Sequence, residues 1–249
     1  MNKLSSLQEA IAGEIHDGMS VVMGCGLESL IPFAAGYEII RQKKKDLALI
    51  APISDMQFDQ IIGAGCVKKV IAAWVGNVAA GLGHNFRRAA EEGIPHPIEV
   101  EDHSNFTIAL ALKAAAVGLP FLPTKTAAGS DFSRAGHFKP VSCPFSGEEL
   151  LAVRAIKPDV AILHVQRADP EGNAHIWGNL GVVVEAARAA KKVILTCEEI
   201  VDHEVILSDP NRTLIQGFLV SSVVHEPFAS HPSPTQGYAR RDDDFYFDY

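Results

Sequence analysis

Short apolar runs alternate with segments of helical spacing along most of this 249-residue chain. Runs that predict buried strands lie at residues 20–23, 47–50, 70–75, 159–165 and 192–197. Apolar residues recur with a helical period at residues 7–15, 32–40, 58–62, 85–92, 106–117 and 180–190. Continuous apolar strands separated by helices are typical of a parallel sheet whose two faces are both covered. The pattern therefore predicts a three-layer α/β/α fold with a mainly parallel sheet.

Two segments break this rhythm within what we expect to be a single domain of residues 1–249. Residues 121–149 are rich in proline and glycine and predict an irregular loop, and a loop of this length is typical of a functional segment or lid. Residues 229–249 mix aromatic with acidic side chains. Because disordered tails are rarely this aromatic, we expect this tail to pack against another surface.

Composition and charge exclude several classes of protein. The formal net charge of −8 disfavours a nucleic-acid partner, because phosphates attract a basic face. The cysteines are scattered without a C-x-x-C pair, which predicts neither a disulfide scaffold nor a zinc ribbon and favours a reduced, cytoplasmic compartment. No apolar run approaches the roughly 20 residues that span a bilayer, and the N-terminal segment has the pattern of an amphipathic helix rather than a signal sequence. We therefore expect no membrane partner.

Candidate binding residues follow the first three predicted strands. In parallel α/β sheets, ligands bind beyond the carboxyl ends of the strands. Glycines at such turns let the backbone approach a ligand, and free N–H groups there can hold an oxyanion or a phosphate. The substrate-binding candidates are Gly24, Cys25, Gly26, Leu27, Glu28 and Ser29 after the first strand, Ser54 and Asp55 after the second, and Gly76 and Asn77 after the third.

Known signatures of catalysis are not found at these turns. Gly24 and Gly26 match a dinucleotide fingerprint, but Ser29 stands where its third glycine would be, and no Walker or G-x-S-x-G sequence occurs. Cys25 and Ser29 could be nucleophiles, although with no base nearby in the sequence they more simply line the turn. The ten histidines lack metal-ligand spacing, so we expect no metal site.

The acidic group at residues 99–102 allows two interpretations. Asp102 or Ser104 could cap the helix that follows, with Glu101 as a favourable charge in its first turn. Alternatively, a carboxylate of this group could point into a cleft as a general acid or base. The residues alone leave both open.

Several ordered segments resemble the family I coenzyme A transferases. DGMSVVMGCGLESLIP is similar to their signature turn, in which Asp-Gly precedes an apolar strand, a glycine-containing loop and a helix started by proline. DLALIAPISD, GAGCVKKVIAAWVGN, CPFSGEE, PDVAILHVQRADPEGNAHIWG and HPSPTQGY resemble further segments, as does IEVEDHSNFTIALALKAAAVGLPFLPTKTAAGSD. They stand in the order found in the A subunits of glutaconate-type transferases and cover almost the whole chain. The resemblance implies a fold of the NagB/RpiA/CoA transferase-like type.

The resemblance also implies a partner and a reaction. Transferases of this type pair an A with a B subunit, usually as an (αβ)₂ assembly, and move CoA between an acyl-CoA and a dicarboxylic or 3-oxo acid. A glutamate of the B-type partner attacks the thioester and forms an anhydride, then a glutamyl-CoA thioester. The turn at residues 24–29 would face the acyl group from across the interface. CoA thioester is then the substrate, and no tightly bound cofactor is expected.

Other functions remain open at this point. The ring-opening hydrolase of steroid catabolism resembles the same family, and by that match Glu101 would be a catalytic residue acting on a cyclic CoA thioester or in C–C cleavage. A decarboxylase on this scaffold is another possibility. The third alternative is a non-catalytic, small-molecule-binding protein with a Rossmann-like sheet.

Overall fold

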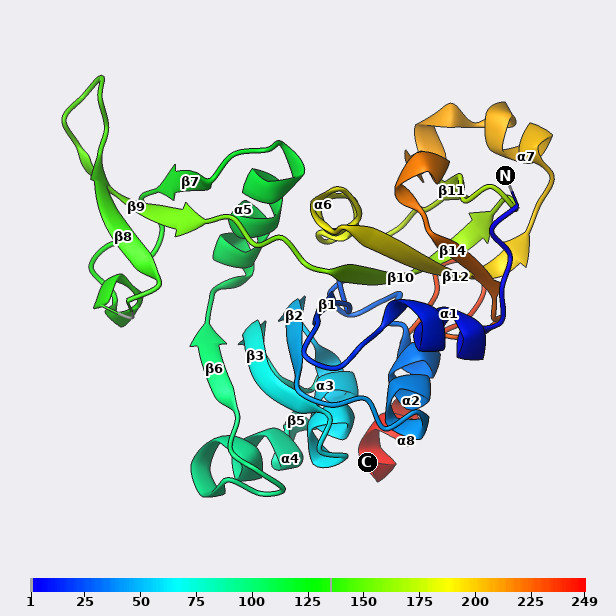
Figure 1. The fold of residues 1–249 in the computed structure, drawn as a ribbon, viewed down its shortest axis with the longest axis horizontal. Coiled ribbons are helices and arrows are strands. Elements are labelled where there is room, and N and C mark those ends of the chain that lie inside the picture. The colour runs from blue at the N-terminus through cyan, green and yellow to red at the C-terminus, as the bar shows by residue number, and fades with distance from the viewer. Residues whose placement is uncertain (1, 135) are drawn as a thin grey trace.

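The computed structural model describes residues 2–134 and 136–249, and a parallel sheet runs through its centre (Figure 1). In spatial order its seven parallel strands are β14, β12, β10, β1, β2, β3 and β6. Two short antiparallel strands extend it from the end of β10. The bounds are β1 Ser20–Val22, β2 Leu47–Ile53, β3 Val67–Trp74, β6 Glu99–Asp102, β10 Val160–Ala168, β11 Ala174–His175, β12 Lys192–Ile200, β13 Thr213–Ile215 and β14 Ser222–His225.

Helices cover both faces of this sheet, which confirms the three-layer α/β fold. On one side α1 (Leu7–Glu14), α2 (Phe33–Arg41) and α3 (Asp55–Gly63) pack in one apolar cluster, and on the other α5 (Asn105–Ala116) and α6 (Val183–Ala189) pack in a second. Neighbouring strand residues divide between the two clusters, as the two-residue period of a strand requires. Val21, Leu49 and Val70 belong to the first cluster, and Val22, Ile50 and Ile71 to the second.

Shorter elements connect these layers. The helical segment expected at residues 85–92 begins as α4 (His84–Arg87) and continues as one π-helical stretch at Arg88–Glu92. Further short elements are β4 Gly76–Asn77, β5 Gly81–Leu82, α7 His203–Ser208, and 3₁₀ turns at Asp131–Arg134, Pro210–Arg212 and Gly217–Leu219. Within the described ranges, none of the helices combines the length and the apolar character needed to cross a membrane.

The order of the strands places a topological switch point between β1 and β10. From β1 the chain proceeds outward through β2, β3 and β6. It then returns to β10, on the other side of β1, and proceeds outward in the opposite direction through β12 and β14. Ligands of open α/β sheets bind in the crevice at such a point. The turn at residues 24–29 follows β1 there.

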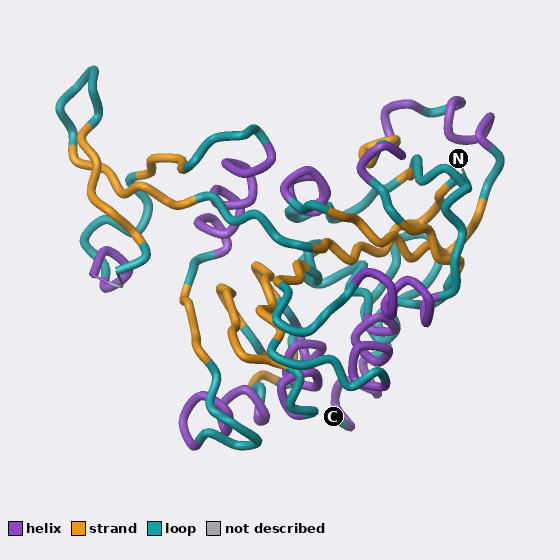
Figure 2. Tube along the Cα trace, in the orientation of Figure 1, coloured by secondary structure: helices purple, strands orange, loops and turns teal. Residues whose placement is uncertain are grey.

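A small antiparallel sheet corrects the expectation of an irregular loop at residues 121–149. It consists of β7 (Phe121–Thr124), β9 (Glu149–Arg154) and β8 (Phe138–Ser142) in that spatial order, and it projects from the body beside α5 (Figure 2). Pro123 and Pro140 lie in its two outer strands. Proline is tolerated on outer strands because its missing N–H need not reach a neighbour. The prolines therefore mark sheet edges here.

The C-terminal tail packs on its own chain. Its helix α8 (Asp243–Asp248) brings the fully buried ring of Tyr246 against Ile31, Phe33 and Met56. The tail thereby covers the side of the sheet that carries α2 and α3.

Candidate active site

The turn at residues 24–29 is held in place by a close backbone approach. Gly24 has a φ of +70°, a value that favours glycine. The backbone N–H of Val182 donates to the Cys25 carbonyl at 2.9 Å. A Cβ on Gly181 would lie 2.1 Å from that same oxygen, and Gly181 itself has a φ of +49°. The turn can adopt this position because residue 181 has no side chain.

A pocket of about 550 Å³ opens beside this turn at the switch point. Glu28 and Ser29 form one side of it, and Asn179 together with residues of the tail, among them Gln236 and Arg241, form the rest. Glu28 is exposed, Leu27 is partly exposed, and the other four residues of the turn are buried. The structure therefore places the end of the predicted turn, rather than all of it, at an accessible surface.

Both nucleophile candidates of this turn are buried. The Cys25 thiol is 2% exposed, and its burial raises its pKa far above the ordinary value of 9.0. The hydroxyl of Ser29 donates to the Gly26 carbonyl at 3.4 Å. This geometry favours the interpretation that both residues line the turn.

The candidates after the second and third strands contact the C-terminal tail. Asp55 accepts hydrogen bonds from the Tyr246 hydroxyl and from the backbone N–H groups of Met56 at 2.8 Å and Val78 at 3.1 Å. The side chain of Asn77 donates to the Tyr246 carbonyl at 2.6 Å. Burial raises the pKa of Asp55, while the hydrogen bond from Tyr246 opposes that rise. Since these groups already have partners within the chain, they anchor the tail.

Ser54 and Gly76 complete this buried group. Ser54 is fully buried, and its hydroxyl donates to the Trp74 carbonyl at 3.2 Å. Gly76 pairs with Leu82 in the β4–β5 hairpin. A substrate-binding role for Ser54, Asp55, Gly76 and Asn77 stays a prediction, and their observed contacts are structural.

The acidic group at residues 99–102 is the edge strand β6, and this corrects the interpretation of Asp102 as a helix cap. Ser104 is the cap of α5, since its hydroxyl accepts from the Thr107 N–H at 3.1 Å. Because residues two apart in a strand share a face, Glu99 and Glu101 both reach Lys69 on the neighbouring strand β3. The Lys69 ammonium lies 2.6 Å from Glu99 and 2.8 Å from Glu101.

The environment of Glu101 keeps its carboxylate charged. Glu101 is 9% exposed, and its second oxygen lies 3.3 Å from His103 Nε2, whose Nδ1 lies 3.0 Å from the Thr107 hydroxyl. The hydrogen bond from His103, followed by that from Lys69, lowers the pKa of Glu101 to about 2 against the opposing effect of burial. At neutral pH this group can act as a base or as a fixed negative charge, but it holds no proton to donate.

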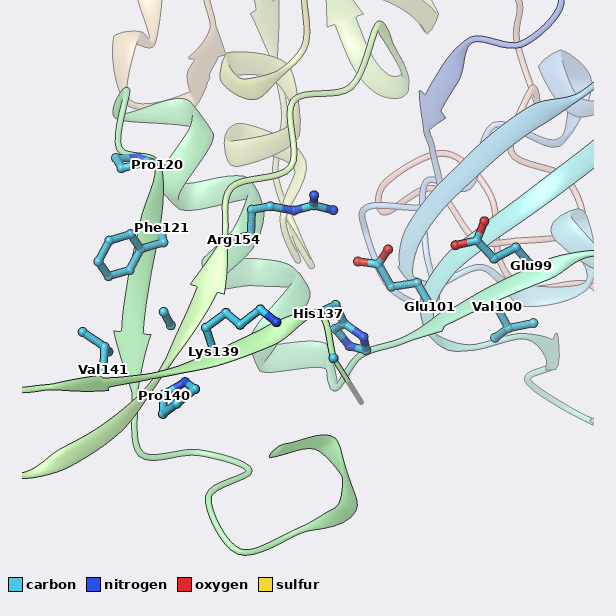
Figure 3. Close-up of a pocket in the computed structure, with 12 residues that line it drawn as sticks. Glu99, Val100, Glu101, Pro120, Phe121, His137, Lys139, Pro140, Val141 and Arg154 are labelled. Carbon is cyan, nitrogen blue, oxygen red and sulfur yellow. The ribbon is translucent and has the colours of Figure 1, made fainter. Parts of the chain in front are cut away.

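A pocket of about 770 Å³ lies between β6 and the small sheet (Figure 3). Glu99 and Glu101 stand on one side of it, and Lys139 and Arg154 extend toward them from the other. The residues that line it are Glu99, Val100, Glu101, Pro120, Phe121, Gly136, His137, Lys139, Pro140, Val141, Ala152 and Arg154. Within residues 2–134 and 136–249, no group of three His, Cys, Asp or Glu side chains is placed to hold a metal ion. The pocket can therefore contact a ligand through carboxylates, cationic side chains and apolar surface.

Sequence reasoning identified Glu101 but not the residues around it. His103 follows Glu101 by two positions, a spacing that in an extended segment places both side chains on the same face and is visible in the sequence. Lys69, Lys139 and Arg154 are distant in sequence, and the registers that bring them near β6 have no local signature. Each of the two pockets is therefore lined by residues that lie far apart in the sequence.

Comparison with known proteins identifies related chains over nearly the full length. The sequence model of the family described as "Coenzyme A transferase" matches residues 4–226. The A subunit of 3-oxoadipate CoA-transferase from Pseudomonas knackmussii is 44% identical over 248 residues, which cover 99% of this chain and 86% of that protein.

Solved structures agree with the sequence match. The crystal structure of glutaconate coenzyme A-transferase from Acidaminococcus fermentans superposes with a TM-score of 0.92 at 35% identity, covering 98% of this chain and 82% of the other. The decarboxylase AibA/AibB superposes with a TM-score of 0.87 at 30% identity, covering 100% and 93%. A cholesterol ring-cleaving hydrolase subunit of Rhodococcus jostii is 27% identical, with 92% of this chain and 80% of that protein covered.

Proposed function

The chain belongs to the coenzyme A transferase family, and from this premise we propose that it is the A subunit of a two-chain enzyme that moves CoA between an acyl-CoA and a carboxylic acid. The observation that carries this proposal is the near full-length identity, at 44% and 35%, to the A subunits of two CoA-transferases. This identity favours transfer over the ring-opening hydrolase and over a non-catalytic binding protein.

The proposal assigns the covalent chemistry to a B-type partner. A partner glutamate attacks the thioester carbonyl, releases CoA thiolate and becomes an acyl anhydride. The thiolate then attacks the glutamyl carbonyl, forms a glutamyl-CoA thioester and releases the first carboxylic acid. A second acid reverses these two steps and leaves as the new thioester. Two A and two B chains would form an (αβ)₂ assembly.

This chain would supply walls of the site rather than its nucleophile. The buried Cys25 thiol, with its raised pKa, and the ion-paired Glu101 carboxylate are both poor nucleophiles in their present surroundings. The turn at residues 24–29 would lie near the acyl group, where backbone N–H groups can stabilise an oxyanion. CoA thioester is the substrate, and the scheme requires no further cofactor.

Substrate and location follow from the same premise. Glutaconate and 3-oxoadipate, named for the two related transferases, are both dicarboxylates. We therefore propose a dicarboxylic or 3-oxo acid as the acceptor. The free thiols at Cys25, Cys66, Cys143 and Cys197 support a reducing, cytoplasmic location.

The decisive experiment is CoA exchange by the chain produced together with its B-type partner. Acetyl-CoA or succinyl-CoA would serve as donor and 3-oxoadipate, glutaconate or glutarate as acceptor. We expect exchange by the complex and none by either chain alone. Borohydride added during turnover should reduce the enzyme thioester, and mass spectrometry should find the altered glutamate on the partner chain.

Several outcomes would contradict the proposal. A complex that exchanges CoA with none of the acids, or that releases free CoA without an acceptor, is not a transferase. Trapping on Glu101 instead of a partner residue would move the nucleophile into this chain. Decarboxylation would be recognised by release of CO₂ with the thioester left intact.

A further inference from the structure

The small sheet has two chemically different faces. In its register Lys139 lies opposite Ala152, and Phe121 lies opposite Arg154. The adjacent residues Phe138 and Val153, which point the other way, are buried in the same apolar cluster as α5. Strand alternation thus separates a core face from an outer face that lines the 770 Å³ pocket. The outer face presents Phe121, Lys139, Val141, Ala152 and Arg154.

Two cations, Lys139 and Arg154, stand on this outer face. Across the pocket, Glu99 and Glu101 already share the ammonium of Lys69. Within residues 2–134 and 136–249, neither Lys139 nor Arg154 forms an ion pair, and Figure 3 shows both reaching inward over the pocket. Two like charges held beside apolar surface repel each other, so a bound anion would be stabilised by both.

We propose that this pocket is a subsite for the anionic end of the substrate, with Arg154 and Lys139 as the groups that bind it. The inference rests on the proposed transferase function and names the part of that site which selects the acid. The planar guanidinium of Arg154 suits a two-oxygen contact with a carboxylate, and Lys139 adds a point charge. Phe121 and Val141 supply the apolar surface for a short carbon chain.

Two parts of the substrates carry a suitable charge. One is the second carboxylate of a dicarboxylic acid or of its CoA thioester, and the other is a phosphate of CoA itself. The apolar surface beside the two cations suits methylene groups that lead to a carboxylate. Both sources share the same anion chemistry, and kinetics with matched acids separates them.

The test uses the complex of this chain with its B-type partner. Arg154→Ala, Lys139→Ala and Arg154→Lys would be compared with the wild type, and Lys157→Ala is the control because Lys157 is an exposed cation outside the pocket lining. The acceptors are glutarate and valerate, five-carbon acids that differ by one carboxylate. We expect the KM for glutarate to rise roughly tenfold or more in both alanine variants, with valerate and the control unchanged.

Other results have defined meanings. A matching rise in the KM for acyl-CoA, the same for both acids, identifies a CoA phosphate as the bound anion and still supports the subsite. Values within twofold of the wild type for every substrate would overturn it. If the wild-type complex exchanges CoA with none of 3-oxoadipate, glutaconate and glutarate, the transferase proposal fails, and calorimetry with glutarate on wild type and Arg154→Ala still decides whether the pocket binds an anion.

Discussion

Replacing Lys69 by methionine tests the electrostatics around Glu101. The substitution keeps most of the aliphatic stem but removes the ammonium that lies 2.6 Å from Glu99 and 2.8 Å from Glu101. Glu101 is only 9% exposed, so water compensates its carboxylate only in part. Glu99 is largely exposed, so water replaces most of the stabilisation that its carboxylate gains from the ammonium. The perturbation therefore acts mainly on one buried charge.

The structure sets the size of the expected loss. A pKa lowered from 4.5 to about 2 corresponds to about 3 kcal/mol of favourable interactions with the ionised carboxylate. His103 supplies the largest part of that lowering and remains in the variant. We assign about 1–2 kcal/mol to Lys69, which for a chain of this size lowers Tm by roughly 2–8 °C.

The pH dependence has a defined sign. Because the pKa of Glu101 is depressed in the folded chain, its contribution to stability is complete above 4.5 and is lost as pH falls toward 2. Lys69→Met lacks the ammonium that helps to lower this pKa, so the variant loses less stability as pH falls. The difference in Tm between wild type and Lys69→Met should thus be constant from pH 5 to 8 and shrink below about 4.5.

Thermal unfolding of the complex across this pH range would measure the difference. Lys68→Met is the matched control, since Lys68 is the exposed neighbour on the same strand, and it is Lys69 whose ammonium reaches Glu99 and Glu101. A loss in Lys69→Met that does not change with pH, or one equal to that of the control, would refute the electrostatic reasoning and indicate lost packing instead.

Two further substitutions test how the chain is held together. Tyr246→Phe removes the hydroxyl that donates to buried Asp55 and should lower the free energy of unfolding by about 1–3 kcal/mol. Because the substitution raises the already elevated pKa of Asp55 further, the loss in Tm should grow as pH rises through that pKa. An unchanged Tm would contradict this reasoning. Gly181→Ala places a Cβ 2.1 Å from the Cys25 carbonyl oxygen at a φ of +49° and should lower both Tm and the CoA exchange rate. The control is Gly13→Ala in helix α1, where a Cβ would meet nothing within 4 Å. This change should be neutral or stabilise the chain by about 0.5–1 kcal/mol. Equal behaviour of the two alanine variants would show that the turn at residues 24–29 does not depend on the close approach.

The sequence by itself determined the layered fold and the place of the glycine turn. The apolar run at residues 159–165 and the helical period at residues 106–117 are local properties, because the side-chain directions of strands and helices repeat within a few residues. Buried parallel strands then require helices on both faces. The segments that resemble the family added a partner and a reaction that no periodicity could supply.

Only the tertiary structure decided which charges meet. Lys69 pairs with Glu101 because β3 and β6 align in one register, and a register between distant strands leaves no mark on either strand alone. Likewise, Tyr246 reaches Asp55 across 191 positions of the chain, and two of the prolines that suggested a loop, Pro123 and Pro140, lie in the edge strands of a sheet. Local sequence specifies directions and periods, whereas contacts between distant residues depend on how whole elements pack.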